Sequence, residues 1–559
     1  MSQEDDQTTD SRVQRLLNHD NLPRFLGIRI LGLLLLAVIV WIARPIFHGV
    51  IYNAVYSPGV LILTLGLLIA GLILLFTPPD TENSVGHADP IFRLQQKAAI
   101  LGTVFVVLFI ISAMYAIPAS LVEQRSLAQD TMEDADILGE FPEVNEENAR
   151  ITPRAVADTQ TRGSVSYRQH RLGDSDIARM SDGRLAWSYA IEPDPFRVQL
   201  TGNQRGVLLS DMTRMENREM QAFDDNHFRY GENMLLHRSA DWNLKTSDYW
   251  SAYVDDPIEF VHDDSAYMAY TKTGHEWRLS PIPHTVPVWN GVALVHEDGT
   301  IDHLSPEEAQ QSEILAGQRL YPLDVAERQM SSLGYRNGII NQLSVVGSFE
   351  GVIEPATLPS GAGNDQPFVI DLAGEQMTYV MAMEPHGTST AGLDEVWFVD
   401  ATTGELSYYA TGAESLRGPD RAMGIARGTD TQTSWGPDGD ALVVEPVPVS
   451  VDGQLWWHSK VVTPDQTDVV RNIFVNAHTD EAVILFDTEE VYEFIGGTDV
   501  DDLDSAEAID ETGDEIDTEP APDDDAVDYY IVIYDEDGQE IDRIPIEPGQ
   551  DVAFESERK

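Results

Sequence analysis

Three long apolar runs lie within the first 120 or so residues, and they constrain the fold more than any other feature of the chain. They cover residues 25–47, 57–76 and 98–122. Each run supplies the roughly 18 to 20 apolar residues that a helix needs to cross about 30 Å of hydrocarbon. A cleaved signal peptide would be shorter, and two more apolar runs would not follow it. The sequence therefore predicts three transmembrane helices within residues 25–122.

The cations around these runs predict their orientation. Arg12, Arg15, Arg24 and Arg29 precede or open the first run, and Arg93 and Lys97 lie between the second and third. Arg44 and Arg125 are the cations near the opposite ends. Because cytoplasmic flanks carry the excess of Lys and Arg, residues 1–24 are predicted to be a cytoplasmic segment. An odd number of spans then places the large C-terminal part outside the cell membrane, in an integral membrane protein.

The outer part is strongly acidic. The chain holds 94 Asp and Glu against 35 Lys and Arg, a formal net charge of -59. Such a surface repels nucleic acid and anionic lipid, which argues against a nucleic-acid partner. The composition resembles that of proteins from salt-in halophilic archaea or their viruses, and it implies an adaptation to molar salt. The chain has no cysteine, which excludes disulfides, thiolate nucleophiles and Cys-bound zinc.

Changes in sequence texture predict the domain organisation beyond the membrane region. Residues 123–150 are polar and acidic and indicate a stalk. Residues 151–497 show short alternating runs separated by DG, TG, GN and PD turns, which is typical of many short strands. Residues 498–528 hold fifteen acidic residues and no basic one and indicate a disordered linker, and residues 529–559 indicate a C-terminal β-hairpin. The expected fold class is α+β, with β structure dominant.

The β-rich region contains four stretches with the same layout. They cover residues 174–211, 255–304, 366–409 and 445–486. Each predicts strand, tight turn, aromatic-bearing strand, variable loop, strand, polar turn and strand, so the ectodomain is expected to hold about four related β-meander modules. In the last stretch Leu455 and Trp457 alternate with Trp456 and His458, which predicts one core face and one partly covered face.

Helices are predicted at three places between the strands. Residues 305–318 open with Ser305, Pro306 and Glu308, which together indicate a capping box with proline at the first helical position. Residues 321–333 and 210–223 are the other two candidates.

The segment "VWFVDATTGELSYY" of the third stretch resembles the strand-turn-strand ending of PepSY-type modules. The fourth stretch has "NAHTDE" at the corresponding turn, and the first two keep little of the pattern. The resemblance implies a small extracytoplasmic α+β module of the type linked to peptidase inhibition or local protein interaction. The resemblance assigns no catalytic residue in this chain.

Residue patterns that carry chemistry are weak. Ser389 in "HGTSTAG" loosely matches a nucleophile elbow, but a strand follows where that turn needs a helix. His227 and His237, near Asp224 and Asp225, do not have the spacing of metal ligands on a helix. Most of the tryptophans of the outer part are expected in the core. We therefore predict no catalytic, cofactor-binding or metal-binding residues and no enzyme activity.

Three classes of function remain open. The favoured one is a membrane-anchored extracytoplasmic binding or structural protein that presents a repeated β-rich surface to other membrane or cell-surface proteins. The alternatives are an accessory or regulatory subunit of a membrane complex, including PepSY-like peptidase regulation or a virion membrane spike, and a hydrolytic ectoenzyme. A pump or transporter is disfavoured because the central parts of the apolar runs carry no ionisable residue.

Overall fold

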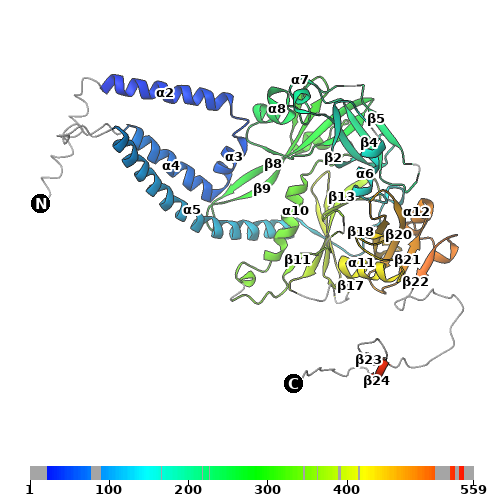
Figure 1. The fold of residues 1–559 in the computed structure, drawn as a ribbon. Helices are drawn as coiled ribbons and strands as arrows, with labels where there is room; N and C mark the ends of the chain where they lie inside the picture. Colours follow the sequence, from blue (N-terminus) through cyan, green and yellow to red (C-terminus); the bar gives the residue numbers. More distant parts are fainter. Residues whose placement is uncertain are drawn as a thin grey trace. The chain divides into compact units, whose positions relative to one another are not determined.

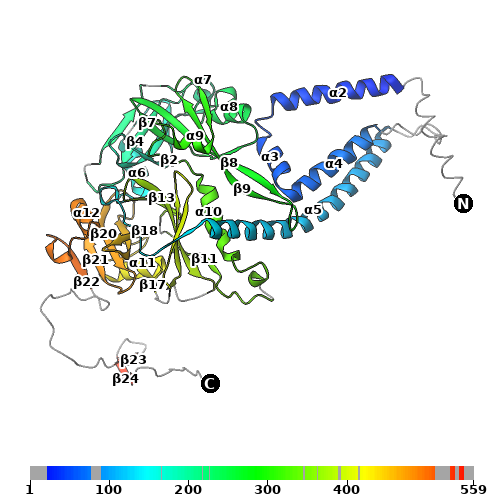
Figure 2. The same ribbon diagram turned by 180° about the vertical axis from the view of Figure 1, so that it is seen from behind.

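The structure is a computed structural model, which describes residues 22–76, 90–164, 166–216, 218–225, 227–343, 346–359, 361, 363–387, 392–412, 416–509, 529–534 and 540–546. The chain divides into two units, residues 1–514 and 515–559. The first unit is a β-rich α+β assembly preceded by apolar helices (Figures 1 and 2). In the second unit the described residues form the hairpin of β23 (Tyr529–Tyr534) and β24 (Glu540–Ile546).

Four helices form the N-terminal region: α2 (Leu22–Ile42), α3 (His48–Tyr56), α4 (Pro58–Phe76) and α5 (Pro90–Asp134). Among the described residues, two helical segments are long and apolar enough to cross a membrane, Pro58–Leu75 and Gln96–Asp134, and Gly27–Ile42 is a shorter apolar helix. Helices α4 and α5 lie side by side (Figures 1 and 2). A Cβ at Gly66 would stand 2.6 Å from Leu108, so the glycine lets the two helices approach closely.

Helix α5 continues well past the predicted end of the third span. Its last turns bury Leu127 and Ala128 against the β-rich part of the protein, residues 135–509. After it, β1 (Asp136–Leu138) pairs in parallel with β16 (Leu406–Ala410), and Phe141 and Asn148 are buried. Residues 123–150, which the sequence indicates as a stalk, are therefore built into the folded region. Polar composition misled here because a strand pairing and a few buried side chains, both formed with distant segments, hold this largely polar stretch in the fold.

Each of the four predicted β stretches lies in a sheet of its own. The first sheet contains β2 (His170–Arg179), β3 (Leu185–Pro193), β4 (Val207–Asp211) and β5 (Met220–Phe223). The second contains β6 (Ala252–Tyr253), β7 (Ile258–His262), β8 (Ser265–Arg278), β9 (His284–His296) and β10 (Ile301–Leu304). In the first sheet β2 to β5 pair in chain order, and in the second β7 to β10 do so. Each set is a four-stranded meander.

The other two sheets repeat this order. In the third, the meander is β12 (Phe368–Leu372), β13 (Gln376–Pro385), β15 (Glu395–Asp400) and β16 (Leu406–Ala410), with β1 and β11 (Ile353–Pro355) added. In the fourth it is β18 (Leu442–Val451), β19 (Gln454–Val462), β20 (Val469–Asn476) and β21 (Ala482–Leu485), with β22 (Glu507–Ile509) added. A separate pair joins β14 (Gly392–Leu393) and β17 (Leu416–Arg417).

A helix precedes each meander in the chain: α6 (Arg154–Ser164), α8 (Ala240–Ser247), α10 (Leu323–Ser332) and α11 (Pro419–Gly428). The remaining helices of the outer part are α7 (Phe196–Thr201), α9 (Pro306–Gln310) and α12 (Thr488–Ile495). In the chain, each of the four meanders therefore follows a helix.

Shared hydrophobic cores join the sheets in pairs. Leu209 of the first sheet and Leu294 of the second belong to one core, with α8 and α9. Trp187 of the first and Trp397 of the third belong to another, with α10. A third core joins the third sheet to the fourth, with α11.

The fourth sheet differs from the sequence expectation of one partly covered face. Leu455 and Trp457 lie in the core shared with the third sheet, whereas Trp456 and Val462 lie in a core with α12 on the opposite face. Both faces of this sheet are buried. Alternation along a strand separates the two faces but does not reveal that a helix covers the second one.

The predicted helices fare differently. The capping box of Ser305 and Glu308 is present, but α9 ends at Gln310 and not at residue 318. The prediction over 321–333 matches α10. The prediction over 210–223 is wrong, because β4 and β5 occupy its ends and pair with each other. Pairing between strands overrides the helical pattern of this segment.

Candidate functional site

A cavity of about 660 Å³ lies where the N-terminal helices meet the β-rich part of the protein. Residues of α3, α4 and α5 form one side, and residues of α8, α10 and the second sheet form the other. Its volume falls within the range of about 300 to 1,000 Å³ that small-molecule sites occupy. Its polar lining includes His48, Tyr52, Asn53, Glu123, His275, Asp324 and Arg328.

Helix α3 contributes an aromatic face to this cavity. His48, Tyr52 and Tyr56 recur at a spacing of four residues, which places them on one side of a helix. The rings of Tyr52 and Tyr56 lie 4.7 Å apart between centroids, and Tyr56 stacks on His275 at 5.5 Å. Planar rings of this kind provide an apolar contact surface with polar edges.

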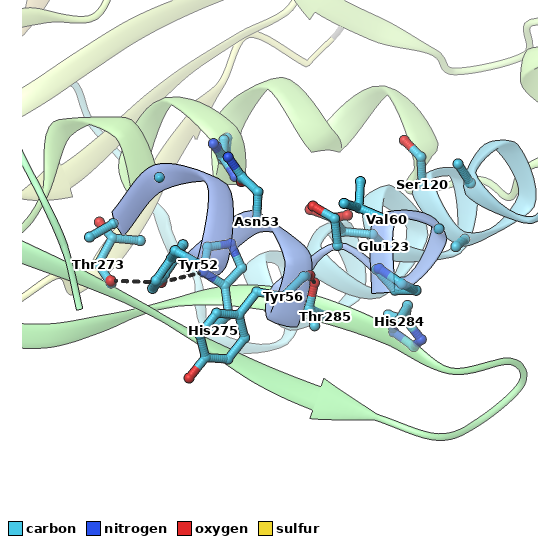
Figure 3. A pocket seen from close by; sticks show the side chains of 18 of the residues that line it. Tyr52, Asn53, Tyr56, Val60, Ser120, Glu123, Thr273, His275, His284 and Thr285 are labelled. Atoms are coloured by element: carbon cyan, nitrogen blue, oxygen red, sulfur yellow. Dashed lines mark hydrogen bonds between the residues drawn. The ribbon is translucent and has the colours of Figure 1, made fainter. Parts of the chain in front are cut away.

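Tyr52 connects α3 to the second sheet. Its hydroxyl donates to the carbonyl oxygen of Thr273 at 3.2 Å and lies 2.8 Å from Nδ1 of His275 (Figure 3). Burial, together with the nearby Arg328 guanidinium, lowers the pKa of His275 to about 4. The imidazole is therefore neutral near pH 7, and Nδ1–H can donate to the tyrosine oxygen while the other nitrogen remains an acceptor.

Hydrogen bonds hold the walls of the cavity together. The Thr285 hydroxyl donates to the carbonyl oxygen of Tyr56 at 2.7 Å, which joins β9 to the end of α3. Ser126 of α5 lies 2.9 Å from Nε2 of His284. The Thr273 hydroxyl donates to the carboxylate of Asp324 at 3.0 Å, which joins β8 to α10. The site is thus assembled from elements far apart in the sequence.

The charges at the cavity have both signs. Glu123 of α5 and Asp324 of α10 supply carboxylates, and Arg328, one turn after Asp324, supplies a guanidinium. The carboxylates accept hydrogen bonds, the guanidinium donates several, and the aromatic rings add flat apolar surfaces. Such a lining suits a small polar molecule with several hydroxyl or zwitterionic groups. A serine–imidazole pair does lie at the cavity wall, Ser126 with His284. Nδ1 of His284 contacts the backbone carbonyl oxygen of Ile282 at 2.8 Å, where a catalytic triad has a carboxylate.

A buried ionic cluster in the fourth sheet is a second place where perturbed groups gather. Arg150 Nε donates to Glu445 at 2.8 Å, and the fully buried Lys460 lies 3.4 Å from the carbonyl oxygen of Glu445. Burial lowers the pKa of Lys460 to about 7. Only a very small cavity adjoins this cluster, so its groups join two sheets and do not face a ligand-sized space.

The residues weighed from sequence do not converge on the cavity. Ser389 lies outside the described residues. His227 precedes the bridge between Phe228 and Gln204, and His237 lies in the short turn Leu236–Arg238. Across the part of the chain that the structure describes, no three His, Asp or Glu side chains meet as a metal site would require.

Tryptophans divide between the core and the surface. Trp187, Trp397, Trp456 and Trp457 are buried, as expected, whereas Trp250 and Trp277 are exposed.

The sequence did not predict the cavity, because its lining residues come from many separate segments. The one available signal was "HGVIYNAVY", where three aromatic rings recur every four residues between two apolar runs.

Together, the fold and the cavity define a β-rich α+β protein with apolar N-terminal helices and a polar site at their junction with the sheets. No family model matches the chain, and searches of curated proteins and of solved structures gave no match either.

Proposed function

We propose that the protein is a membrane-anchored, extracytoplasmic binding protein whose β-rich part stands on three transmembrane helices, α2, α4 and α5. Helix α2 has 21 residues, which at 1.5 Å per residue gives about 31 Å, enough for one crossing. Its apolar side chains are exposed on all sides, as those of a helix in lipid are. Residues 1–24 then lie in the cytoplasm.

The cavity is the observation that supports a binding function. Its walls come jointly from the membrane-proximal helices and from the second sheet, and aromatic, acidic and basic side chains line it. A purely structural anchor has no need of a polar space of this size at its junction. The ligand is a small polar molecule at the outer face of the membrane.

The four helix-and-meander units are related copies in this account, similar to PepSY modules. Two of their turns support a common origin. The side chain of Asp400 accepts from the backbone N–H groups of Thr402 and Thr403 at 2.6 and 2.8 Å. Asn476 in the fourth sheet accepts from those of His478 and Thr479 at 2.8 and 3.2 Å. A repeated unit enlarges the surface available to other proteins without a new fold.

A second candidate is an accessory or regulatory subunit, and helix α5 favours it. The helix continues from its exposed apolar part, through Pro118, to residues buried against the sheets, such as Leu127 and Thr131. Proline removes a hydrogen bond and bends a helix, so α5 links a membrane partner to the sheets through a bend between these two parts.

Native mass spectrometry of the full-length protein, extracted from its own membranes in mild detergent at high salt, tests the proposal. We expect a small-molecule adduct that is lost in the variant Asp324→Asn with Arg328→Gln. Asp263→Asn with Arg229→Gln, away from the described lining of the cavity, is the matched control and retains the adduct. The absence of any adduct, or its persistence in the first variant, would count against a binding function at this cavity.

A further inference from the structure

The β8–β9 hairpin runs along α5 toward the membrane end of that helix. Three contacts follow one another along α5 toward its N-terminal end. Arg278 forms an ion pair with Asp130 at 2.8 Å, and Nε2 of His284 lies 2.9 Å from the Ser126 hydroxyl. The carbonyl oxygen of Pro283 then accepts a hydrogen bond from the Tyr115 hydroxyl at 2.8 Å. The hairpin tip, residues 279–283, is therefore its most membrane-proximal part. Figures 1 and 2 both show the hairpin reaching the place where α4 and α5 meet.

The exposed apolar band of α5 ends at the same level. Large exposed apolar side chains recur along α5 from Ile100 to Ile117, and none follows them in the rest of the helix. Seventeen steps of 1.5 Å make this band about 26 Å long, close to the thickness of the hydrocarbon layer. Tyr115 lies two residues before its outer end. The hairpin tip is thus held at the boundary between hydrocarbon and head groups.

The tip itself is apolar and exposed. Residues 279–283 read "LSPIP", with no charge between Arg278 and His284. Leu279 is 77% exposed, and Trp277 is exposed beside it. Large apolar side chains in water are unfavourable by about 25 cal/mol for each Å² of exposed apolar surface. In an outer part this acidic, an uncharged apolar tip next to a transmembrane helix needs an apolar environment.

A second turn of the outer part has the same character at the end of α2. The Tyr249 hydroxyl donates to the carbonyl oxygen of Arg44, and Arg44 donates to the carbonyl oxygen of Thr246 at 2.6 Å. Trp250, next in the chain, is 52% exposed. Tryptophan and tyrosine are enriched where membranes meet water, because their rings are apolar and their polar atoms need partners.

We infer that Trp250, Trp277 and Leu279 form a lipid-facing surface that inserts into the outer leaflet of the bilayer. Continuity with the ends of α2 and α5 assigns lipid as the occupant, because the same helices continue into the membrane. The outer part is then seated on the leaflet at two turns as well as held by its helices. This places the cavity at the depth of the lipid head groups. The inference depends on the proposed membrane-spanning helices.

Spin labelling of the full-length protein in phosphatidylcholine vesicles at high salt tests this surface. The natural chain has no cysteine, so Leu279→Cys, Leu68→Cys and Ile137→Cys each introduce a single labelling site. Leu68 of α4 is 60% exposed and reports whether the helix spans, and Ile137 of β1 is 71% exposed and serves as the water-facing control. The power-saturation accessibilities to oxygen and to a water-soluble nickel chelate measure the depth of each label.

We expect the label at position 279 to be several-fold less accessible to nickel, and more accessible to oxygen, than the label at 137. Equal values at 279 and 137, with position 68 shielded from nickel, would overturn the lipid-facing surface and leave the membrane anchor intact. Low accessibility at 279 to both reagents would assign the tip to a protein contact and overturn it too. Full nickel access at position 68 would refute the spanning helices and this surface together. Each replaced side chain is largely exposed, so folding is retained.

Discussion

At the scale of single residues, the outer part buries charge where neighbouring sheets meet. Arg150 lies 4.9 Å above the ring of Trp187 of the first sheet while it pairs with Glu445 of the fourth. Removing one partner of such a pair costs several kcal/mol, because the other charge remains buried. Lys460, in the same cluster, makes the charge state of this junction depend on pH.

Lys460 gives a prediction with a defined sign. Burial lowers its pKa from the ordinary 10.5 to about 7 in the folded state. Between these values the unfolded chain holds a proton that the folded chain has released, so this residue makes stability rise with pH. Lys460→Met should remove a rise of a few kcal/mol between pH 7 and 10.

Urea unfolding of both proteins at several pH values measures this difference. Lys245→Met, which removes a surface ion pair with Asp241, is the control and should leave the pH dependence unchanged. A Lys460→Met variant that keeps the wild-type rise would show that Lys460 stays charged in the fold.

At the scale of elements, the strands were largely predictable and the helices less so. The Asp-Gly pairs at 182–183, 298–299 and 452–453 marked hairpin turns, and Gly183, Gly299 and Gly453 adopt the positive φ angles that such turns demand. The segment 210–223 was misassigned because Met220 pairs with Ser210 in the sheet. Local propensity does not contain that long-range pairing.

The two Asx-type turns give a prediction about the repeated units. Asp400→Ala and Asn476→Ala each remove a side-chain acceptor from two backbone N–H groups, so each should destabilise the protein by about 1 to 3 kcal/mol. Urea unfolding measures both. Asp298→Ala, which removes an acceptor from the one N–H of Thr300, should have a smaller effect. A large effect of one variant and none of the other would argue against equivalent turns.

The packing of α4 on α5 gives a third prediction. A Cβ at Gly59 would lie 2.9 Å from both Ala116 Cβ and the carbonyl oxygen of Ser112. Gly59→Val should therefore force the helices apart and cost about 1 to 3 kcal/mol. Gly71→Val is the matched control, since no atom lies within 4 Å of a Cβ there. Thermal unfolding in detergent should show a lower midpoint for the first variant only, and equal midpoints would contradict this packing.

At the scale of the whole molecule, composition and hydrophobic patterning predicted the class of fold, whereas short sequence motifs predicted no functional site. The apolar runs and the alternating strands gave the class of fold, but the cavity depends on contacts such as that of Tyr52 with His275, 223 residues apart. No spacing along the chain shows such a contact. The resemblance to PepSY modules and the absence of enzyme activity stay predictions.

The net charge of -59 gives a prediction for the whole chain. Self-repulsion at low salt should destabilise the fold, and screening with a Debye length of about 3 Å near 1 M salt should relieve it. The thermal midpoint should therefore rise between about 0.2 M and 3 M KCl, as measured by circular dichroism in detergent. A midpoint that is independent of salt would remove the case for a halophilic adaptation.

The central claim, a membrane anchor with the β-rich part outside, is tested most directly by labelling two single-cysteine variants in intact cells. Val470→Cys lies on an exposed position of the fourth sheet, and Ser2→Cys lies in the predicted cytoplasmic segment. The account predicts that a membrane-impermeant maleimide labels Val470→Cys at once and labels Ser2→Cys only after the cells are lysed. Labelling of Ser2→Cys in intact cells, with Val470→Cys protected, would contradict it.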